Sequence, residues 1–373
     1  MRRWTVLVAL VISLTMLLPA EFGLAKPDTT DTKSHKHLHA SSKSSASNPT
    51  VASSEGSKKH GTKHVSSRET GRRSADAATV KSSSKSKRHA VAQAPARPAG
   101  SAAPAVPDSY KGEFGVDTKA AMVLDLENGQ VLYAQDADTP IAPASLTKII
   151  TLFLINERLR DGSLKPDQLI PVTPQASHAG GSTMRLRTGE MVPLEELIKG
   201  IAVASANDGC VAFAQFFGNG DIQPFVELMN RKAQELGMTN THFYNPNGLP
   251  ADGQVTTARD MALLARAYLT SFPQMLAIHS MTEFTHNNRV RHNSNSLLGK
   301  VEGVDGLKTG FVCSSGFNIV VTAKRNGTRL VAVVLGAKNR RIREREATRL
   351  VEEGFKLVAA ENAQSGKRVA MIR

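Results

Sequence analysis

The chain contains 373 residues, and its 47 Lys and Arg outnumber its 33 Asp and Glu to give a formal net charge of +14. Most of the excess lies in residues 26–108, which hold 15 Lys and Arg against 6 Asp and Glu, so the sequence beyond residue 108 carries only about +4. The two cysteines form no CxxC pair and have no metal-ligand spacing with a histidine, which argues against a structural zinc site.

The first 25 residues have the pattern of a secretory signal peptide. Arg2 and Arg3 precede an apolar stretch from Trp4 to Leu18, and small residues occupy positions 23 and 25. Because this stretch is shorter than the ~20 residues that a membrane-spanning helix needs, we expect cleavage and export to the periplasm or the cell wall. An uncleaved N-terminal membrane anchor is the alternative.

Residues 26–108 are rich in Ser, Ala, Lys, His, Thr and Pro and have almost no large apolar side chain to bury. Such a composition predicts a disordered, basic linker. Nucleic acid is a poor partner for an exported chain, so electrostatic contact with an anionic envelope polymer or membrane surface is the better hypothesis. A solvated spacer without a partner is the other interpretation.

From residue 109 the composition is that of a globular domain, which we expect to extend to residue 357. Two apolar runs, 120–126 and 130–134, flank an Asn128-Gly129 turn, a pattern typical of a β-hairpin. The next run, residues 149–159, is apolar almost all round and predicts a helix buried in the core.

Further along, amphipathic patterns predict three helices, which begin near Pro193, Pro224 and Thr257. A second hairpin follows at residues 316–323 and 329–335 with Asn326-Gly327 at its turn, and then a helix over roughly 341–358. Strands open and close the domain while helices fill its middle. We therefore expect an α+β fold, with an antiparallel sheet shared between the two chain ends, flanking helices and a helical subdomain.

Ser145 and Lys148 lie three residues apart at the start of the buried apolar segment. A serine hydroxyl becomes a strong nucleophile only when a base takes its proton, and a lysine can do so if burial and a helix N-terminus lower its pKa. The free N–H groups of a first helical turn also suit an oxyanion. Taken alone, the pair is a weak signal and is explained more simply by an N-capping serine and a partly exposed lysine.

A second polar cluster, Ser205-Ala206-Asn207-Asp208, interrupts an apolar segment where Ser and Asn compete with backbone hydrogen bonds. It predicts either polar groups directed into a cleft or a polar loop between two helices. A third, Lys308-Thr309-Gly310, precedes the second hairpin. It predicts an edge strand with a cation and a hydroxyl for a carboxylate, or a charged edge that protects against aggregation.

Together the three clusters form an ordered SxxK, SxN and KTG set, which is typical of penicillin-binding proteins and class A β-lactamases. From about residue 109 to 355 the chain resembles the D-alanyl-D-alanine carboxypeptidase family, the low-molecular-mass penicillin-binding proteins. The resemblance extends to phrases such as 241–243, 258–262 and 303–310. It implies a β-lactamase/transpeptidase-like fold and no cofactor or metal.

The resemblance also implies a role for each motif residue. Ser145 would attack the bond between the two terminal D-alanines of a peptidoglycan stem peptide, with Lys148 as its base and Ser205 as a proton relay. Substrate would be held by Asn207, Lys308, Thr309, Gly310 and Phe311, with the backbone N–H groups of positions 145 and 311 as the oxyanion hole. Penicillins and other β-lactams would acylate the same serine as covalent inhibitors.

Several alternatives remain open at this stage. A D,D-endopeptidase that cleaves peptidoglycan cross-links is the nearest, followed by a β-lactamase and by an inactive wall-binding protein. Family members often continue into a small β-rich domain and an amphipathic anchor, whereas residues 358–373 predict only a short C-terminal tail. We expect Cys210 and Cys313 to be free thiols, although export makes a disulfide between them permissible.

Overall fold

The structure is a computed structural model that describes residues 114–372, with side chains described as far as Ala363. The predicted signal peptide at 1–25 and basic linker at 26–108 lie outside the described residues. In the part that is described, no helix is both long enough and apolar enough to cross a membrane.

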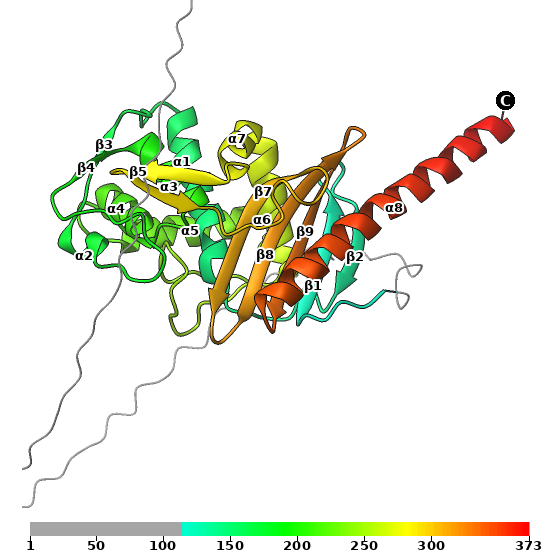
Figure 1. The fold of residues 1–373 in the computed structure, drawn as a ribbon, viewed down its shortest axis with the longest axis horizontal. Helices are drawn as coiled ribbons and strands as arrows, with labels where there is room; N and C mark the ends of the chain where they lie inside the picture. The colour runs from blue at the N-terminus through cyan, green and yellow to red at the C-terminus, as the bar shows by residue number, and fades with distance from the viewer. Residues whose placement is uncertain (1–113, 373) are drawn as a thin grey trace, which may run out of the picture. The chain divides into compact units, whose positions relative to one another are not determined.

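A five-stranded antiparallel sheet forms the centre of the fold (Figure 1). Both predicted hairpins are confirmed, and the first strand of the N-terminal hairpin pairs with the last strand of the C-terminal one. At the second turn, Asn326 and Gly327 both have positive φ, which the type I′ hairpin turn requires. The strands, in sheet order, are β2 (Val131–Gln135), β1 (Ala120–Asp125), β9 (Thr328–Ala337), β8 (Gly316–Arg325) and β7 (Val304–Val312).

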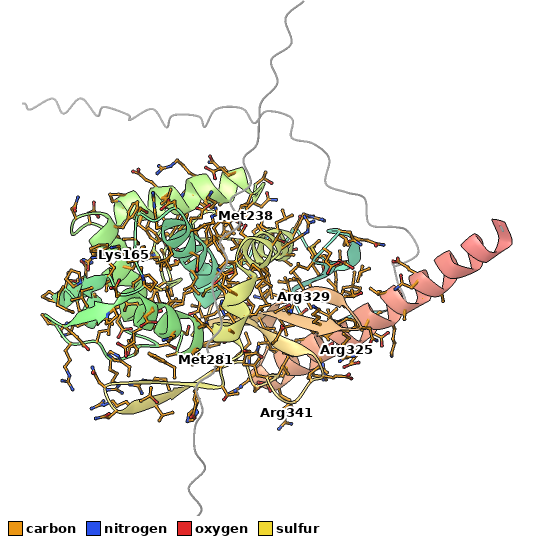
Figure 2. The ribbon with its side chains drawn as sticks, turned by 90° about the horizontal axis from the view of Figure 1, so that it is seen from above. Lys165, Met238, Met281, Arg325, Arg329 and Arg341 are labelled. Carbon is orange, nitrogen blue, oxygen red and sulfur yellow. The ribbon has the colours of Figure 1, made fainter. Side chains whose placement is uncertain are left out.

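The two faces of the sheet are covered by different helices, as the alternation along β1 shows. Met122 and Leu124 belong to the large core beneath the helical region, whereas Ala121 and Val123 face the smaller core under the C-terminal helix α8 (Arg340–Ile372). Figure 1 shows α8 crossing the front of the sheet and extending past its edge. An ion pair of 2.6 Å between Arg325 and Glu352 fastens α8 to the end of β8, near the labelled Arg325 in Figure 2.

The helical region holds the predicted buried helix and the three predicted amphipathic ones. The buried helix, α1, has every residue from Lys148 to Asn156 in the interior. At the start of α6, the Thr257 side chain accepts a hydrogen bond from Asp260 N–H, so the predicted N-cap is confirmed. The helices are α1 (Lys148–Arg160), α2 (Pro174–Ser177), α3 (Leu194–Val203), α4 (Asn207–Phe217), α5 (Gln223–Glu235), α6 (Ala258–Ser271) and α7 (Leu276–His279).

Some elements differ from the expectation. The last helix continues to Ile372 rather than ending near Val358, because residues 359–364 are mostly good helix formers. Two small hairpins that periodicity does not reveal accompany the helical region, since strands of three or four residues are too short to show a period. They are β3 (Leu169–Pro171) with β4 (Met191–Pro193), and β5 (Glu283–His286) with β6 (Arg289–His292).

Candidate active site

Ser145 lies in η2 (Ala144–Thr147), a short 3-10 helix that leads directly into α1. It is therefore not the N-cap of the buried helix. The residue before it, Ala144, has φ +50°, a left-handed conformation that costs a non-glycine residue of order 1 kcal/mol or more and is typical of functional sites. Gly248 lies against η2 so closely that an added Cβ would be 1.8 Å from the Ala144 carbonyl oxygen. The two segments thus fix the position of Ser145 together.

Lys148 is fully buried, not a partly exposed lysine, and its ammonium nitrogen lies at the centre of the site. Nζ is 2.9 Å from Ser145 Oγ and 2.7 Å from Asn207 Oδ1, and it also hydrogen-bonds the Asn247 carbonyl oxygen. The two carbonyl acceptors engage two N–H bonds. When the amine is neutral, its lone pair is therefore left to face the serine hydroxyl.

The electrostatics of the site increase the neutral fraction of the amine at position 148. Burial lowers the pKa of Lys148 from 10.5 to about 8, and the Cys210 and Asp208 side chains oppose this shift only in part. At pH 7 about a tenth of the lysine is then neutral, far more than for an ordinary lysine. Burial also lowers the pKa of Lys308 well below its usual value, and the charge of Lys148 acts in the same direction.

The second motif forms the connection between α3 and α4, so the expected loop between two helices is observed, and its polar side chains also reach a cleft. Ser205 has φ +58° and is almost buried. Asn207 begins α4 and joins both sides of the site, because its Oδ1 accepts from Lys148 while its Nδ2 donates to the Gly180 carbonyl oxygen at 2.9 Å. Its backbone N–H donates to Ser182 O. Asn207 therefore holds the loop at 180–182 beside Lys148.

Asp208 is a residue to which sequence reasoning assigned no role. Its buried carboxylate accepts hydrogen bonds from the backbone N–H groups of Met184, Leu186 and Gly209, at 3.0–3.1 Å. It therefore fastens the loop that lines the site to the start of α4. The only signal in the sequence was that Asp208 is a charged residue within an apolar segment. Charged residues are rarely buried unless they are paired.

The third motif lies on β7, which is the edge strand of the sheet, as predicted. Lys308 is buried and its Nζ donates to the Thr309 carbonyl oxygen at 3.0 Å. An added Cβ on Gly310 would be 3.1 Å from Ser145 N, so glycine allows the strand to approach η2 closely. The next residue, Phe311, is 51% exposed, and its ring packs against Phe317.

Side chains from α7 and from the loop after β6 hydrogen-bond the first part of β7. The ring of His279 is buried, and burial, with the charge of Lys308, lowers its pKa to about 3, so the ring is neutral. Its Nδ1 donates to the Leu307 carbonyl oxygen, and its Nε2 accepts from the Tyr268 hydroxyl, both at 3.1 Å. Asn295 donates to the Gly306 carbonyl oxygen. The strand before Lys308 is thus held by side chains on its unpaired edge.

All three motifs meet at one cavity of about 450 Å³, which we call the motif cavity. It is lined by Ser145, Ser205, Asn207, Thr309, Gly310 and Phe311, while Lys148 and Lys308 are buried close by. Arg343, from the first turn of α8, also lines it and was missed by sequence reasoning, because nothing distinguishes it from its neighbouring arginines. Its side chain is almost buried, and its Nε has no hydrogen-bond partner among the described residues.

The two cysteines are both free thiols, as expected, but they differ in exposure. Cys210 is buried in α4, and Cys313 is exposed in the turn between β7 and β8. Burial raises the pKa of the Cys210 thiol to about 12, so it stays protonated beside the two lysines.

Comparison with known proteins gives one family. A family model described as D-alanyl-D-alanine carboxypeptidase matches residues 107–339. The chain is 40% identical over 248 residues to the D-alanyl-D-alanine carboxypeptidase DacC of Escherichia coli, a match that covers 65% of this chain and 62% of that protein. It is 30% identical over 238 residues to a D-alanyl-D-alanine endopeptidase of Pseudomonas aeruginosa, covering 62% of this chain and 75% of that protein.

Comparison with solved structures agrees with the sequence comparison. The crystal structure of penicillin binding protein 6B from Escherichia coli is similar with a TM-score of 0.63 and 35% identity, over 66% of this chain and 80% of that chain. This likeness confirms the fold class expected from the sequence. The chain spans less than two thirds of the length of the carboxypeptidase DacC and of its counterparts DacF and DacA.

Proposed function

Because the chain belongs to the D-alanyl-D-alanine carboxypeptidase family, we propose that it is a serine peptidase that removes the terminal D-alanine from peptidoglycan stem peptides. The observation that carries the proposal is the buried Lys148 amine, 2.9 Å from Ser145 Oγ and held by two carbonyl acceptors. This is the arrangement that a lysine base requires in order to activate a serine.

In the acylation step, Lys148 takes the proton from Ser145 as Oγ attacks the carbonyl carbon of the penultimate D-alanine. The backbone N–H groups of Ser145 and Phe311 bind the developing oxyanion, and Ser145 benefits from its place in the first turn of η2. The proton then passes to the departing amine of the terminal D-alanine, with Ser205 as the relay. The products are an acyl-enzyme and free D-alanine.

The terminal carboxylate of the substrate would bind at the other end of the motif cavity. Lys308 and Thr309 supply an amine and a hydroxyl there, and a bound carboxylate would favour the protonated form of the amine. Gly310 leaves room for the peptide backbone. Arg343 adds a guanidinium to the cavity wall, and this positive charge favours a carboxylate there. Asn207 would hold the substrate amide on the acyl side.

Deacylation needs a water molecule, activated by the same lysine once it has returned its proton. A β-lactam would acylate Ser145 in the same way. Its ring-opened product keeps the leaving group attached, which slows the attack of water. Covalent inhibition by β-lactams is therefore part of the proposal, and it agrees with the likeness to penicillin binding protein 6B.

The second candidate function is a D,D-endopeptidase that acts on peptidoglycan cross-links with the same residues. The similarity to the endopeptidase of Pseudomonas aeruginosa favours it. Both reactions share the acyl donor and differ only in the leaving group, so the motif cavity supports either.

One experiment separates these functions. The purified chain and a Ser145→Ala variant are incubated with a pentapeptide stem ending in D-alanyl-D-alanine and with a cross-linked dimer, and released products are measured. We expect D-alanine from the pentapeptide, little cleavage of the dimer, and neither product with the variant. Cleavage of the dimer alone would establish the endopeptidase, and no release from either substrate would overturn both.

We also propose that residues 1–25 direct export and are removed, that the catalytic domain spans 109–357, and that the enzyme acts on the cell wall in the periplasm and so affects cell shape. The basic segment 26–108 would then contact the anionic envelope, because it carries a net charge of about +9. Deleting it should reduce sedimentation with purified cell wall at low salt and leave penicillin acylation intact. Unchanged sedimentation would contradict this contact.

A further inference from the structure

A groove of about 370 Å³ lies between one face of α5 and the segment 242–244. This volume lies within the range of about 300–1,000 Å³ that is typical of small-molecule sites. The groove shares no wall residue with the motif cavity. The residues of α5 that line it recur three and four positions apart and form one stripe on the helix: Gln223, Val226, Glu227, Asn230, Arg231 and Gln234.

The two walls of the groove are fixed to each other by Asn230. Its side-chain amide donates to the Phe243 carbonyl oxygen, and its Oδ1 accepts from the Phe243 N–H, both at 2.8 Å. On the other side, His242 exchanges both backbone hydrogen bonds with Val255. The segment 242–244 is therefore held from two sides, and the groove needs no rearrangement to accept a ligand.

Two aromatic rings from the segment 242–244 line the groove. Phe243 is buried, whereas its neighbours His242 and Tyr244 are exposed, as the alternation of an extended segment requires. The centroids of the two outward rings are 4.7 Å apart, and Tyr244 is 46% exposed. A large ring that is nearly half exposed in a groove offers a flat apolar surface to the C–H groups of a ligand.

The polar groups in the α5 wall are either neutral or paired. Glu227 and Arg231 lie 3.8 Å apart as an exposed ion pair, so this wall carries no net charge. The side-chain amides of Gln223 and Gln234 are exposed and form no hydrogen bond with any described residue. Such amides donate to and accept from hydroxyl and acetamido groups. Flat apolar rings beside uncommitted amides match a neutral sugar better than an ion.

The groove is close to the motif cavity along the chain. Tyr244 and Gly248 are four residues apart, a span of at most about 14 Å, and Gly248 lines the motif cavity. In a pentapeptide stem, four residues precede the bond that the proposed function would cut, and they too extend to at most about 14 Å. If that function holds, a stem whose end lies in the motif cavity can carry its glycan to the groove.

We propose that the groove binds the glycan of peptidoglycan, a chain of N-acetylated amino sugars, with Tyr244 stacked on one sugar and Gln234 hydrogen-bonded to its polar groups. The enzyme then acts faster on stems attached to a glycan than on free stem peptides. This preference rests on the proposed function, whereas binding of the glycan itself needs no catalysis. Because one exposed ring and a few amides carry the contact, the preference is a few-fold effect.

The test compares a free pentapeptide stem with the same stem attached to a disaccharide of N-acetylated amino sugars. D-alanine release gives kcat/KM for each substrate with the full chain and with four variants: Tyr244→Ala, Tyr244→Phe, Gln234→Ala and Gln274→Ala. Gln274 is an exposed glutamine that lines neither the groove nor the motif cavity and serves as the matched control. Acylation by benzylpenicillin reports whether the motif cavity of each variant is intact.

We expect the full chain to favour the disaccharide-linked stem by about two- to tenfold in kcat/KM, the size of one ring contact. The preference should disappear in Tyr244→Ala, decrease in Gln234→Ala, and persist in Tyr244→Phe, which keeps the ring, and in Gln274→Ala. Gln234 lies on α5 and not on the segment that leads into the loop 245–249. Its variant therefore tests the groove without a change next to that loop.

Equal kcat/KM for the two substrates with the full chain would overturn the glycan groove, and so would a preference that both Tyr244→Ala and Gln234→Ala retain. In both cases D-alanine is still released, so the proposed function survives.

A direct titration keeps the groove testable if the full chain releases no D-alanine and the proposed function fails. The probe is a tetrasaccharide of N-acetylglucosamine without a stem peptide, added to the full chain in a calorimeter. We expect binding that Tyr244→Ala weakens by at least about threefold and Gln274→Ala leaves unchanged. Absence of binding, or equal affinity in Tyr244→Ala, would overturn the groove.

Discussion

Lys148 is the residue whose environment decides the chemistry. A lysine at the surface is protonated at neutral pH and offers no lone pair to a serine. Here complete burial lowers the pKa of Lys148 to about 8. Two carbonyl oxygens accept hydrogen bonds from the amine, so the lone pair of the neutral amine faces Ser145 Oγ. The burial that makes the charged ammonium unfavourable is therefore also what allows the neutral amine to act as a base.

The pH dependence of acylation follows from this pKa. Lys148 must be neutral to act as a base, so the second-order rate of acylation by benzylpenicillin should rise with pH below about 8 and level off above it. Well below that pKa, each pH unit should change the rate by about tenfold. Stopped-flow measurement between pH 6 and 9.5 tests this, with thermal melting at each pH as the control for unfolding. A flat profile across this range would contradict a lysine base.

Asp208 provides a second test at the scale of one residue. Replacing it with Ala leaves three backbone N–H groups without their acceptor in a buried place. We expect the free energy of unfolding to fall by about 2–4 kcal/mol, and acylation to slow because the loop at 180–186 loses its attachment. Chemical denaturation measures the first effect. The exposed Asp167→Ala should change stability by less than about 0.5 kcal/mol; a similar small change in Asp208→Ala would show that the loop is held by other contacts.

At the scale of elements, the site depends on two segments that approach η2 so closely that only glycine fits without displacing it. The loop 245–249 presses against η2 at Gly248, and β7 presses against it at Gly310. The loop is stiffened by Asn245, whose side chain accepts from Gly248 N–H and donates to the Leu249 carbonyl oxygen. Both glycines matter because a Cβ at either would push η2, and Ser145 with it.

Gly248→Ala tests this close approach. The added Cβ would overlap the Ala144 carbonyl oxygen, and position 248 has φ +82°, so the variant carries both a steric and a backbone cost. We expect acylation to slow by at least about tenfold, because a small displacement of a nucleophile is costly, and the melting temperature to fall. The matched control is Gly299→Ala, where φ is +70° but nothing lies within 4 Å. It should lose only about 1–2 kcal/mol of stability and keep its acylation rate. Equal acylation rates in the two variants would contradict the role of the contact.

The features that could be predicted from the sequence are those set by local preferences of the chain, and the features that could not are contacts that only the fold creates. The hairpin at Asn326-Gly327 and the cap at Thr257 could be predicted because each depends on a local preference of the chain. The Asn247 carbonyl that binds Lys148 could not, because every residue has a carbonyl group and only the fold brings this one to the lysine. Arg343 is likewise one of several arginines at the start of α8, and only the packing of α8 on the sheet shows that it faces the motif cavity.

At the scale of the whole molecule, the excess positive charge and the three sequence motifs lie in different segments of the chain. The +14 net charge comes mainly from residues 26–108, whereas the three motifs lie in the described domain between Ser145 and Gly310. The sheet that positions the third motif is completed by strands from both ends of this domain, since β1 pairs with β9. The edge strand β7 pairs with its neighbour β8, and the sheet that supports this hairpin is completed by strands from both ends of the domain.

The identity of the acylated residue tests the role of Ser145 as the nucleophile most directly. The purified chain is exposed briefly to benzylpenicillin, denatured and digested, and the adduct is located by mass spectrometry. We expect one adduct, on the peptide that contains Ser145, and none in the Ser145→Ala variant. An adduct on Ser205 or another residue, or release of D-alanine by the Ser145→Ala variant, would contradict this role.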